Sequence, residues 1–382
     1  MVSHSDYVRQ LPEASADLAR RPGIFQRLHI DLPLLVLLLV LTGMGLLVLF
    51  SASGQQFSAI IRQGRYIILA YIVMMIAAQF SVQQYQRWAP WLYLLGMGSL
   101  AAVLLVGIGA KGAQRWLSIA GFRFQPSELM KLLVPLTVAW YLASRIMPPS
   151  FKHVIVSLVI VVLPMVLVLK QPDLGTALLI VISGLFVLFL SGIGWRYIVG
   201  AFVSALAAAY PAWQYLLHDY QKQRILTLLN PERDKLGAGW NIIQSKTAIG
   251  SGGWDGKGWL NGTQSQLDFL PESHTDFIIA VLAEEFGLQG VLLLFAVYLL
   301  LICRGLWISL HAQDSFGRLA AGSITLTFFV YVFVNMGMVS ELLPVVGIPL
   351  PLVSAGGTSI VTLLAGFGIL MAISTEKRLI GQ

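Results

Sequence analysis

Apolar runs of about 20 residues recur along the chain, and this pattern constrains the fold more than any other feature of the sequence. A helix needs about 20 apolar residues to cross the hydrocarbon core of a bilayer. Ten runs approach or reach this length between charged or turn-forming residues, at 32–50, 66–80, 88–107, 127–143, 154–169, 174–193, 197–216, 277–303, 319–339 and 357–373. The sequence therefore predicts an all-α polytopic membrane protein with about ten transmembrane helices and a large loop between helices 7 and 8.

The composition excludes other classes of protein. Apolar residues make up 57% of the chain and charged residues only 11%, whereas a soluble domain has about 25% charged residues. Glycine and proline are spread through the apolar runs without a period, which excludes fibrous and disordered chains. The formal net charge of +7 reflects loop charge and topology in a membrane protein, so we expect no nucleic-acid partner. The single cysteine, Cys303, cannot form an intrachain disulfide.

The distribution of Lys and Arg predicts the orientation. An even number of spans places both termini on one side. The terminal segments and the loops on that side carry twelve of the 25 basic residues, against six in the short opposite loops. Because cytoplasmic loops are enriched in Lys and Arg, we expect cytoplasmic termini. The expected organisation is a cytoplasmic segment at 1–31, a membrane domain at 32–376 that includes an extracytoplasmic loop at 217–275, and a cytoplasmic tail at 377–382.

Ionisable residues in or beside apolar runs are costly in a bilayer and are the first functional candidates. They are Glu128, Lys131, Asp173, Asp276, Glu284, Glu285 and Glu341. The predicted topology places Glu128, Asp173, Asp276 and Glu341 toward the non-cytoplasmic face. One outward-facing polar cavity is therefore expected.

The segment FLPESHTDF, at 269–277, places Ser, His, Thr and Asp directly before the eighth run. In one interpretation, Thr275 or Asp276 caps the helix by accepting a hydrogen bond from a backbone amide. In the other, Asp276 is a general base, because the membrane boundary and the helix N-terminus act on its basicity in opposite directions. Both interpretations stay open. His274 has no His or Cys at ligand spacing, which favours a solvated loop residue over a metal ligand.

Glu128 and Lys131 are three residues apart, so they can pair on one side of a helix. An internal ion pair is the simplest explanation of two charges there. The preceding loop adds Lys111, Arg115 and Arg123, however, and these cations together with Lys131 suit a diphosphate headgroup. Contact with anionic phospholipids is the alternative.

Three further segments have structural explanations as well as functional ones. Asp173 follows a proline and is expected to cap a helix. Glu284 and Glu285 point about 100° apart on a helix, so one is expected to line the cavity while the other pairs elsewhere. Gly287 together with Gly290 is expected to break or thin that helix. The segment at 344–359, which contains Ser354, reads either as a re-entrant loop whose amides hold an anion or as a plain turn before a helix.

The sequence lacks several catalytic motifs. It has no P-loop, no HExxH, no CxxC and no GxSxG. ATP hydrolysis, zinc chemistry, serine-hydrolase chemistry and redox chemistry therefore have no support.

Four ordered motifs carry a resemblance to a known family. They are KGAQRWLSIAGFRFQPSELMKL at 111–132, QPDLGTALL at 171–179, the glycine-rich and tryptophan-rich segment at 230–287, and GIPLPLVSAGGTS at 347–359. With these motifs the chain resembles the SEDS family of shape, elongation, division and sporulation proteins. The segment TQSQLDFLPESHTDF is most similar to the rod-shape members of the family, and the resemblance covers all ten predicted spans.

The resemblance implies a peptidoglycan glycosyltransferase that polymerises lipid II at the outer face of the cytoplasmic membrane during cell-wall elongation. It also implies a class B penicillin-binding transpeptidase and other membrane proteins of the elongation complex as partners. The Asp of the HTDF motif, which is essential in the family, falls on Asp276. The expected substrate-binding residues are Glu128, Lys131, Arg115, Arg123, Ser127, His274 and Ser354.

Two other functions fit the same residues. A lipid II flippase would bind the headgroup with the same cations and would use the intramembrane acids to relay protons or to line a path. A non-catalytic scaffold would recruit the transpeptidase without chemistry of its own. A divalent cation could assist a departing diphosphate, but the sequence shows no dedicated ligand set and predicts no metal site.

Overall fold

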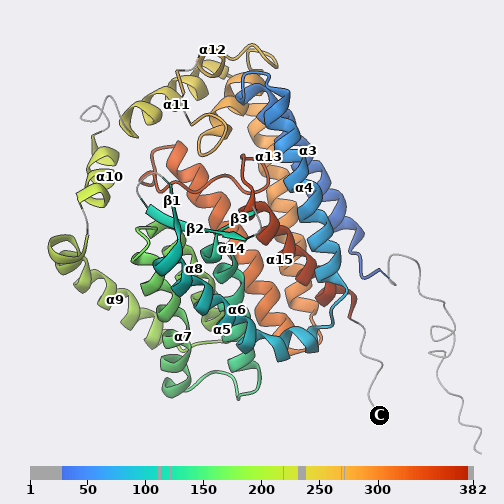
Figure 1. The fold of residues 1–382 in the computed structure, drawn as a ribbon, viewed down its shortest axis with the longest axis vertical. Coiled ribbons are helices and arrows are strands. Elements are labelled where there is room, and N and C mark those ends of the chain that lie inside the picture. Colours follow the sequence, from blue (N-terminus) through green and yellow to red (C-terminus); the bar gives the residue numbers. More distant parts are fainter. Residues whose placement is uncertain are drawn as a thin grey trace, which may run out of the picture.

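The computed structural model describes residues 28–110, 113–119, 122–217, 219–230, 238–267, 269–270 and 272–376. Within these ranges, each of the ten predicted runs falls on a helix, and all of these helices except Trp195–Pro211, which lies outside, pack together in one bundle (Figure 1). The ten helices are α3 (Leu32–Ala52), α4 (Phe57–Ala78), α5 (Val82–Val106), α6 (Pro126–Ala143), α7 (Phe151–Leu169), α8 (Leu174–Leu190), α9 (Trp195–Pro211), α13 (Ile278–His311), α14 (Ser315–Val339) and α15 (Thr358–Thr375).

Seven of the described helices, α3, α4, α5, α7, α13, α14 and α15, are long and apolar enough to cross a membrane. Among the other three, α6 carries Glu128 and Lys131, while α8 and α9 have 17 residues each. The protein is thus a polytopic helical membrane protein, as predicted. The number of ten spans stays a prediction.

Side-chain caps explain where several helices begin. Ser81 and Gln84 form a reciprocal capping box at the start of α5. At the start of α14, Asp314 Oδ1 accepts a hydrogen bond of 2.9 Å from the amide of Gly317. Such caps satisfy amides that have no partner inside the helix, which fixes the first turn.

The centre of the bundle is formed by α6, α8, α14 and α15. Of an apolar stretch of 18 residues in each helix, 72% is buried in α14 and 61% in α15, but only 17% in α4 and 28% in α7. Because lipid is as apolar as a protein core, the outer helices can leave side chains such as Leu95 and Leu163 exposed. Charged residues of α6 therefore lie among central helices and away from the lipid-facing surface.

A small antiparallel sheet, absent from the all-α prediction, connects α5 to α6. Its strands are β1 (Ile108–Ala110), β2 (Ala113–Ile119) and β3 (Phe122–Phe124), in the order β1-β2-β3. Leu117 pairs with Phe124, and Ile108 pairs with Trp116. Strands this short show too little alternation to be recognised beside long apolar runs. The sheet covers the end of the bundle at which α6 and α8 begin (Figure 1).

The connection between α9 and α13 runs as an arc around the outside of the bundle (Figure 1). Its described pieces are the π-helical turn η1 (Ala212–Leu216), α10 (Asp219–Leu229), α11 (Ala238–Gly252) and α12 (Thr263–Gln266). Helix α11 packs on α13. The sequence predicted short structured pieces here, and the described helices agree with that prediction.

Helix α13 is interrupted at Gly287, where the backbone has φ 62° and ψ −161°. The loop after α11 docks into this break, with amides of Lys257 and Gly258 donating to the carbonyls of Glu284 and Glu285 at 3.0 and 2.9 Å. A Cβ atom on Gly287 would lie 2.4 Å from the amide nitrogen of Gly256. The prediction that Gly287 breaks the helix is confirmed, and the break is where the long connection attaches.

Candidate functional site

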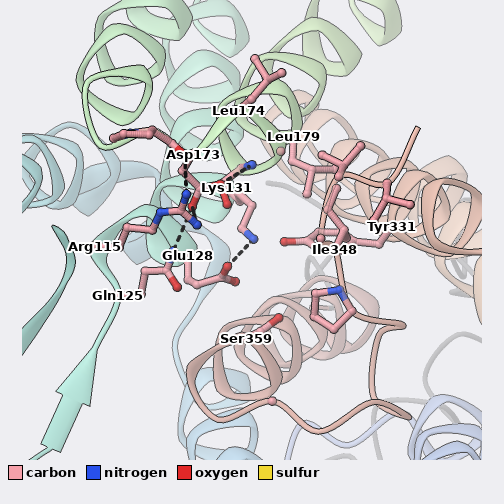
Figure 2. A pocket seen from close by; sticks show the side chains of 18 of the residues that line it. Arg115, Gln125, Glu128, Lys131, Asp173, Leu174, Leu179, Tyr331, Ile348 and Ser359 are labelled. Carbon is pink, nitrogen blue, oxygen red and sulfur yellow. Dashed lines mark hydrogen bonds and ion pairs between the residues drawn. The ribbon is translucent and has the colours of Figure 1, made fainter. Parts of the chain in front are cut away.

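A cavity of about 410 Å³ opens where the sheet, the starts of α6 and α8, and the segment at 344–359 meet. Its charged and amide-bearing lining residues are Arg115, Gln125, Glu128, Lys131, Asp173, Gln221 and Arg224. Figure 2 shows Arg115 and Glu128 on one side of this cavity, with Tyr331 and Ile348 on the other. The sequence predicted one polar cavity that gathers Glu128, Asp173, Asp276 and Glu341. Glu128 and Asp173 line the observed cavity, whereas Asp276 and Glu341 do not, and Glu341 instead pairs with Lys246 at 2.9 Å.

Glu128 and Lys131 form a buried ion pair at the start of α6. Lys131 Nζ lies 2.7 Å from Glu128 Oε1, and the two side chains are only 7% and 9% exposed. Pro126 occupies the first helical turn and Glu128 follows it, which suits the positive end of the helix dipole. The ammonium group also lies 4.7 Å from the ring centroid of Tyr331 on α14. The predicted pairing is confirmed, and it fixes Lys131 at the cavity wall.

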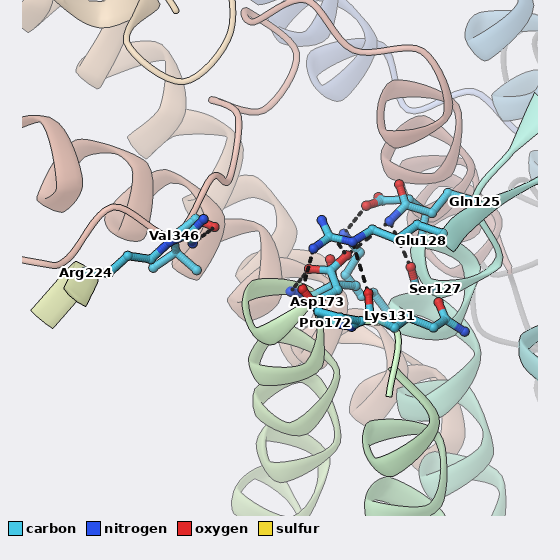
Figure 3. A network of polar contacts seen from close by, with 11 residues as sticks. Gln125, Ser127, Glu128, Lys131, Pro172, Asp173, Arg224 and Val346 are labelled. Carbon is cyan, nitrogen blue, oxygen red and sulfur yellow. Dashed lines mark hydrogen bonds and ion pairs between the residues drawn. The ribbon is translucent and has the colours of Figure 1, made fainter. Parts of the chain in front are cut away.

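Arg115 reaches from β2 to the start of α8. Its Nε donates to the carbonyl of Gln171 at 3.2 Å, another guanidinium nitrogen donates to the carbonyl of Pro172, and Nη1 lies 3.7 Å from Asp173 Oδ2. Figure 3 shows this network together with Gln125, whose amide also donates to Asp173. The side chain of Arg115 remains 34% exposed. It is therefore held by several partners and still accessible from the cavity.

Asp173 both caps helix α8 and contacts other side chains in the cavity. Its Oδ1 accepts a hydrogen bond of 3.2 Å from the amide of Thr176, so it caps α8 as predicted. Its Oδ2 binds Gln125 and faces Arg115 inside the cavity. The cap thereby anchors the guanidinium group of Arg115.

Asp276 lies in the turn before α13, at the margin of the cavity. A Cβ atom built on Gly347, which lines the cavity, would lie 3.6 Å from Asp276 Oδ2. Asp276 is partly exposed and is not itself a lining residue. Helix α13 begins at Ile278 with Phe277 in the N-cap position, and Thr275 Oγ1 binds Glu272 Oε2 at 2.7 Å. Neither Thr275 nor Asp276 therefore occupies the N-cap position, and the role of Asp276 as a general base stays a prediction.

Two of the expected binding residues lie in the contact between the 272–277 turn and the 344–359 segment. Ser354 is 2% exposed, and its hydroxyl donates to the carbonyl of Thr275 at 2.5 Å while accepting from the amide of Leu350 at 2.9 Å. The side chain of His274 is exposed, and its carbonyl accepts from the amide of Ala355 at 3.0 Å. Neither residue lines the cavity. Ser354 joins two loops, and a role in substrate binding remains a prediction for both residues.

Ser127 and Arg123 were expected beside Glu128. Ser127 is 1% exposed and accepts a hydrogen bond of 3.0 Å from the side chain of Gln125, so it supports a lining residue without lining the cavity itself. Arg123 lies in β3 next to the start of α6, and its side chain falls outside the described part of the chain, as does Lys111. Their contacts with substrate remain predictions.

Glu284 and Glu285 are a correction to the sequence analysis, because neither lines the cavity. Both are fully buried near the break in α13. Glu284 accepts from Lys257 Nζ at 2.7 Å and from the amide of Thr263 at 2.8 Å, while Glu285 accepts from the hydroxyl of Ser51. The two adjacent acids point apart on the helix, as expected. The connection between α9 and α13 folds back and binds Glu284, while Glu285 binds Ser51 of α3.

Residues of α10 and α14 that no sequence pattern singled out also reach the cavity. Arg224 and Gln221 of α10 line it, and Arg224 Nη1 donates to the carbonyl of Val346 at 3.1 Å. Figure 3 shows Arg224 and Val346 apart from the network around Asp173. The only available signal was a short amphipathic stretch within a polar segment. Nothing in that pattern indicates that α10 lies over the cavity.

The described residues contain no group of three or more His, Cys, Asp or Glu side chains arranged to hold a metal ion. Within the cavity, the two acidic residues Glu128 and Asp173 are each engaged with a cation from the same wall. The arrangement presents Arg115, Lys131 and Arg224 to the cavity. Guanidinium and ammonium groups of this kind suit a phosphate-bearing ligand.

The fold and the site define a multi-pass helical membrane protein with a charged cavity at one end of its bundle. The model of the FtsW/RodA/SpoVE cell cycle proteins matches residues 32–379. The chain belongs to this family, which is the SEDS family of the sequence analysis.

Its relatives match nearly the whole chain. The peptidoglycan glycosyltransferase MrdB of Escherichia coli K12 is 52% identical over 367 residues, covering 96% of this chain and 99% of MrdB. The probable peptidoglycan glycosyltransferase FtsW of Geobacter metallireducens is 38% identical over 91% of this chain and 95% of its own length.

Solved structures agree with the fold. A chain from a structure described as the coordination of polymerization and crosslinking by a peptidoglycan synthase complex has a TM-score of 0.80 and 30% identity, covering 90% of this chain and 97% of that one. The rod shape determining protein RodA of Thermus thermophilus has a TM-score of 0.67 and 28% identity, covering 90% and 96%. The likeness therefore extends over most of the chain.

Proposed function

We propose that this protein is a peptidoglycan glycosyltransferase that polymerises lipid II into glycan strands during cell-wall elongation. The observation that carries the proposal is the cavity that Arg115 and Lys131 line, whose wall at Gly347 lies next to the carboxylate of Asp276. The names of the relatives, peptidoglycan glycosyltransferases in both the MrdB and FtsW groups, support it.

In the proposed reaction, the carboxylate of Asp276 accepts the proton from the 4-hydroxyl of the acceptor sugar. That oxygen forms a bond to the anomeric carbon of the growing chain, and the bond from this carbon to the phosphate oxygen breaks. Undecaprenyl diphosphate leaves with the electron pair. Because a diphosphate leaves without prior protonation, one carboxylate is sufficient, and direct displacement inverts the anomeric centre.

The cations of the cavity act on the leaving group. Negative charge grows on the diphosphate as the glycosidic bond breaks, so Lys131 and Arg115 stabilise the transition state more than the ground state. In the structure each cation has an acidic partner, Glu128 or Asp173. These partners hold the cations in position, so little reorganisation is needed when the diphosphate gains charge.

The topology and partners follow from the same proposal. The cavity faces the outside of the cytoplasmic membrane, both termini are cytoplasmic, and a class B penicillin-binding transpeptidase crosslinks the strands. The likeness to a chain of a peptidoglycan synthase complex, in which polymerization and crosslinking are coordinated, supports such a partner. The orientation is checked in a Cys303→Ser background, where a Lys246→Cys protein should react with a membrane-impermeant maleimide in intact spheroplasts.

Polymerisation by the purified protein tests the function. Wild-type protein given lipid II in detergent should produce glycan strands, and Asp276→Asn should lower the rate by about 100-fold or more, as loss of a general base does. Polymer made by Asp276→Asn at the wild-type rate would exclude Asp276 as the base. A flippase would translocate lipid II across vesicles without making polymer, and a scaffold would bind the transpeptidase with no reaction in either form.

A further inference from the structure

The main chain of the turn that carries Asp276 is held by donors from other parts of the molecule. Three successive carbonyls, those of His274, Thr275 and Asp276, accept hydrogen bonds from the Ala355 amide, the Ser354 hydroxyl and the Asn335 side-chain amide. The three distances are 3.0, 2.5 and 2.9 Å. Because this turn precedes the first residue of α13, the helix itself does not fix these carbonyls.

Asn335, on α14, makes the contact at Asp276 itself. The residue is completely buried, and its Nδ2 donates both to the carbonyl of Asp276 at 2.9 Å and to the carbonyl of Ile348 at 2.8 Å. Both partners are acceptors, so only the amide nitrogen, with its two N–H groups, fits between them. The orientation of the side-chain amide is therefore fixed by its surroundings.

The second carbonyl connects Asn335 to the cavity. Ile348 lines the cavity, as Figure 2 shows, and the preceding residue Gly347 is the one beside Asp276 Oδ2. One buried amide thus joins the turn with Asp276 to the wall of the cavity at 347–348. A shift of the turn relative to this wall would have to break one of the two hydrogen bonds.

We propose that Asn335 is a positioning residue for Asp276, holding the carboxylate at a fixed place relative to the bound sugar. This inference rests on the proposed glycosyltransferase function, in which Asp276 is the base. A displacement of about 1 Å at a reacting group can lower a rate by about 100-fold. Loss of the two N–H donors should therefore act on the chemical step more than on lipid II binding, since Arg115 and Lys131 stay in place.

The test compares two substitutions on the same helix. Asn335→Leu removes both donors and keeps the number and branching of the side-chain heavy atoms. Ser323→Ala is the matched control, because Ser323 is also completely buried on α14 and its hydroxyl donates to the carbonyl of Ser183 on α8 at 2.6 Å, outside the cavity. Asn335→Leu removes two buried hydrogen bonds to backbone carbonyls and Ser323→Ala removes one, so both should lower the melting temperature.

Kinetics with lipid II in detergent separate positioning from stability. Asn335→Leu should lower kcat by about 10-fold to 100-fold and change KM by less than about 3-fold. Ser323→Ala should keep kcat within about 2-fold of the wild-type value. An unchanged kcat in Asn335→Leu, or an equal loss of kcat in the control, would overturn the assignment.

A second variant covers the case in which Asn335→Leu does not fold. Asn335→Asp has the same shape and, when protonated, offers one donor where the amide offers two, so it should also lower kcat with little change in KM. Wild-type kinetics from Asn335→Asp would overturn the assignment. Absence of polymer from the wild-type protein would instead remove the proposed function, and the role of Asn335 with it.

Discussion

At the scale of single residues, the cavity depends on charges that hold one another. The Lys131–Glu128 pair is almost fully buried, and its value lies in keeping two costly charges compatible with the membrane. A buried pair adds little stability compared with apolar residues of the same volume, but removal of one partner leaves a buried charge without compensation. Stability and function should therefore respond differently to single and double substitutions.

Lys131→Met should lower the free energy of unfolding by about 3–5 kcal/mol, because Glu128 is left buried and unpaired. Adding Glu128→Gln should restore most of that stability without restoring polymerisation, since the cation for the diphosphate is still missing. Thermal unfolding in detergent and the polymerisation assay measure the two effects. A double variant that polymerises at the wild-type rate would show that Lys131 serves only the fold.

Residue-scale predictions succeeded where the cause is local in sequence. The pairing of Glu128 with Lys131 follows from a spacing of three on a helix, and the cap by Asp173 follows from Pro172 before a helix start. Glu284 and Glu285 hold the long connection on α13 and do not line the cavity. This role depends on the loop that contains Lys257 and Thr263, which folds back onto α13. No local sequence pattern indicates that this loop folds back, so one of the two acids was predicted to line the cavity.

At the scale of elements, the break in α13 is the attachment point of the long connection. The loop after α11 replaces the missing helical hydrogen bonds, and Leu288 and Gln289 donate to the carbonyls of Gly253 and Trp254. The close approach leaves no room for side chains at Gly256 and Gly287. The break in α13 is therefore needed for the loop after α11 to pack against the helix. In the sequence, only the glycine at 287 indicated this break.

Gly287→Ala should destabilise the protein by at least about 2 kcal/mol, because a side chain is strained at a φ of 62° and its Cβ atom would clash with backbone. Gly250→Ala is the matched control, since Gly250 lies in α11 with nothing within 4 Å of a built Cβ atom. The control should be neutral or slightly stabilising. Equal melting temperatures for the two variants would contradict this account of the break.

At the scale of the whole molecule, hydropathy predicted the helices, and the charge cost of the membrane predicted a polar cavity. Neither argument predicted the three-stranded sheet that brings Arg115 to Asp173. Neither predicted that α10 brings Arg224 to the opposite side of the cavity. Both depend on how short, polar segments fold back over the bundle. Such contacts leave no periodic signal, because they involve a few residues far apart in the chain.

The most direct measurement is a solved structure of the Asp276→Asn protein with lipid II bound. The account predicts a diphosphate in contact with Lys131 and Arg115, and a sugar 4-hydroxyl within hydrogen-bonding reach of residue 276, directly or through one water. A diphosphate bound outside this cavity, or an acceptor hydroxyl far from residue 276, would contradict it.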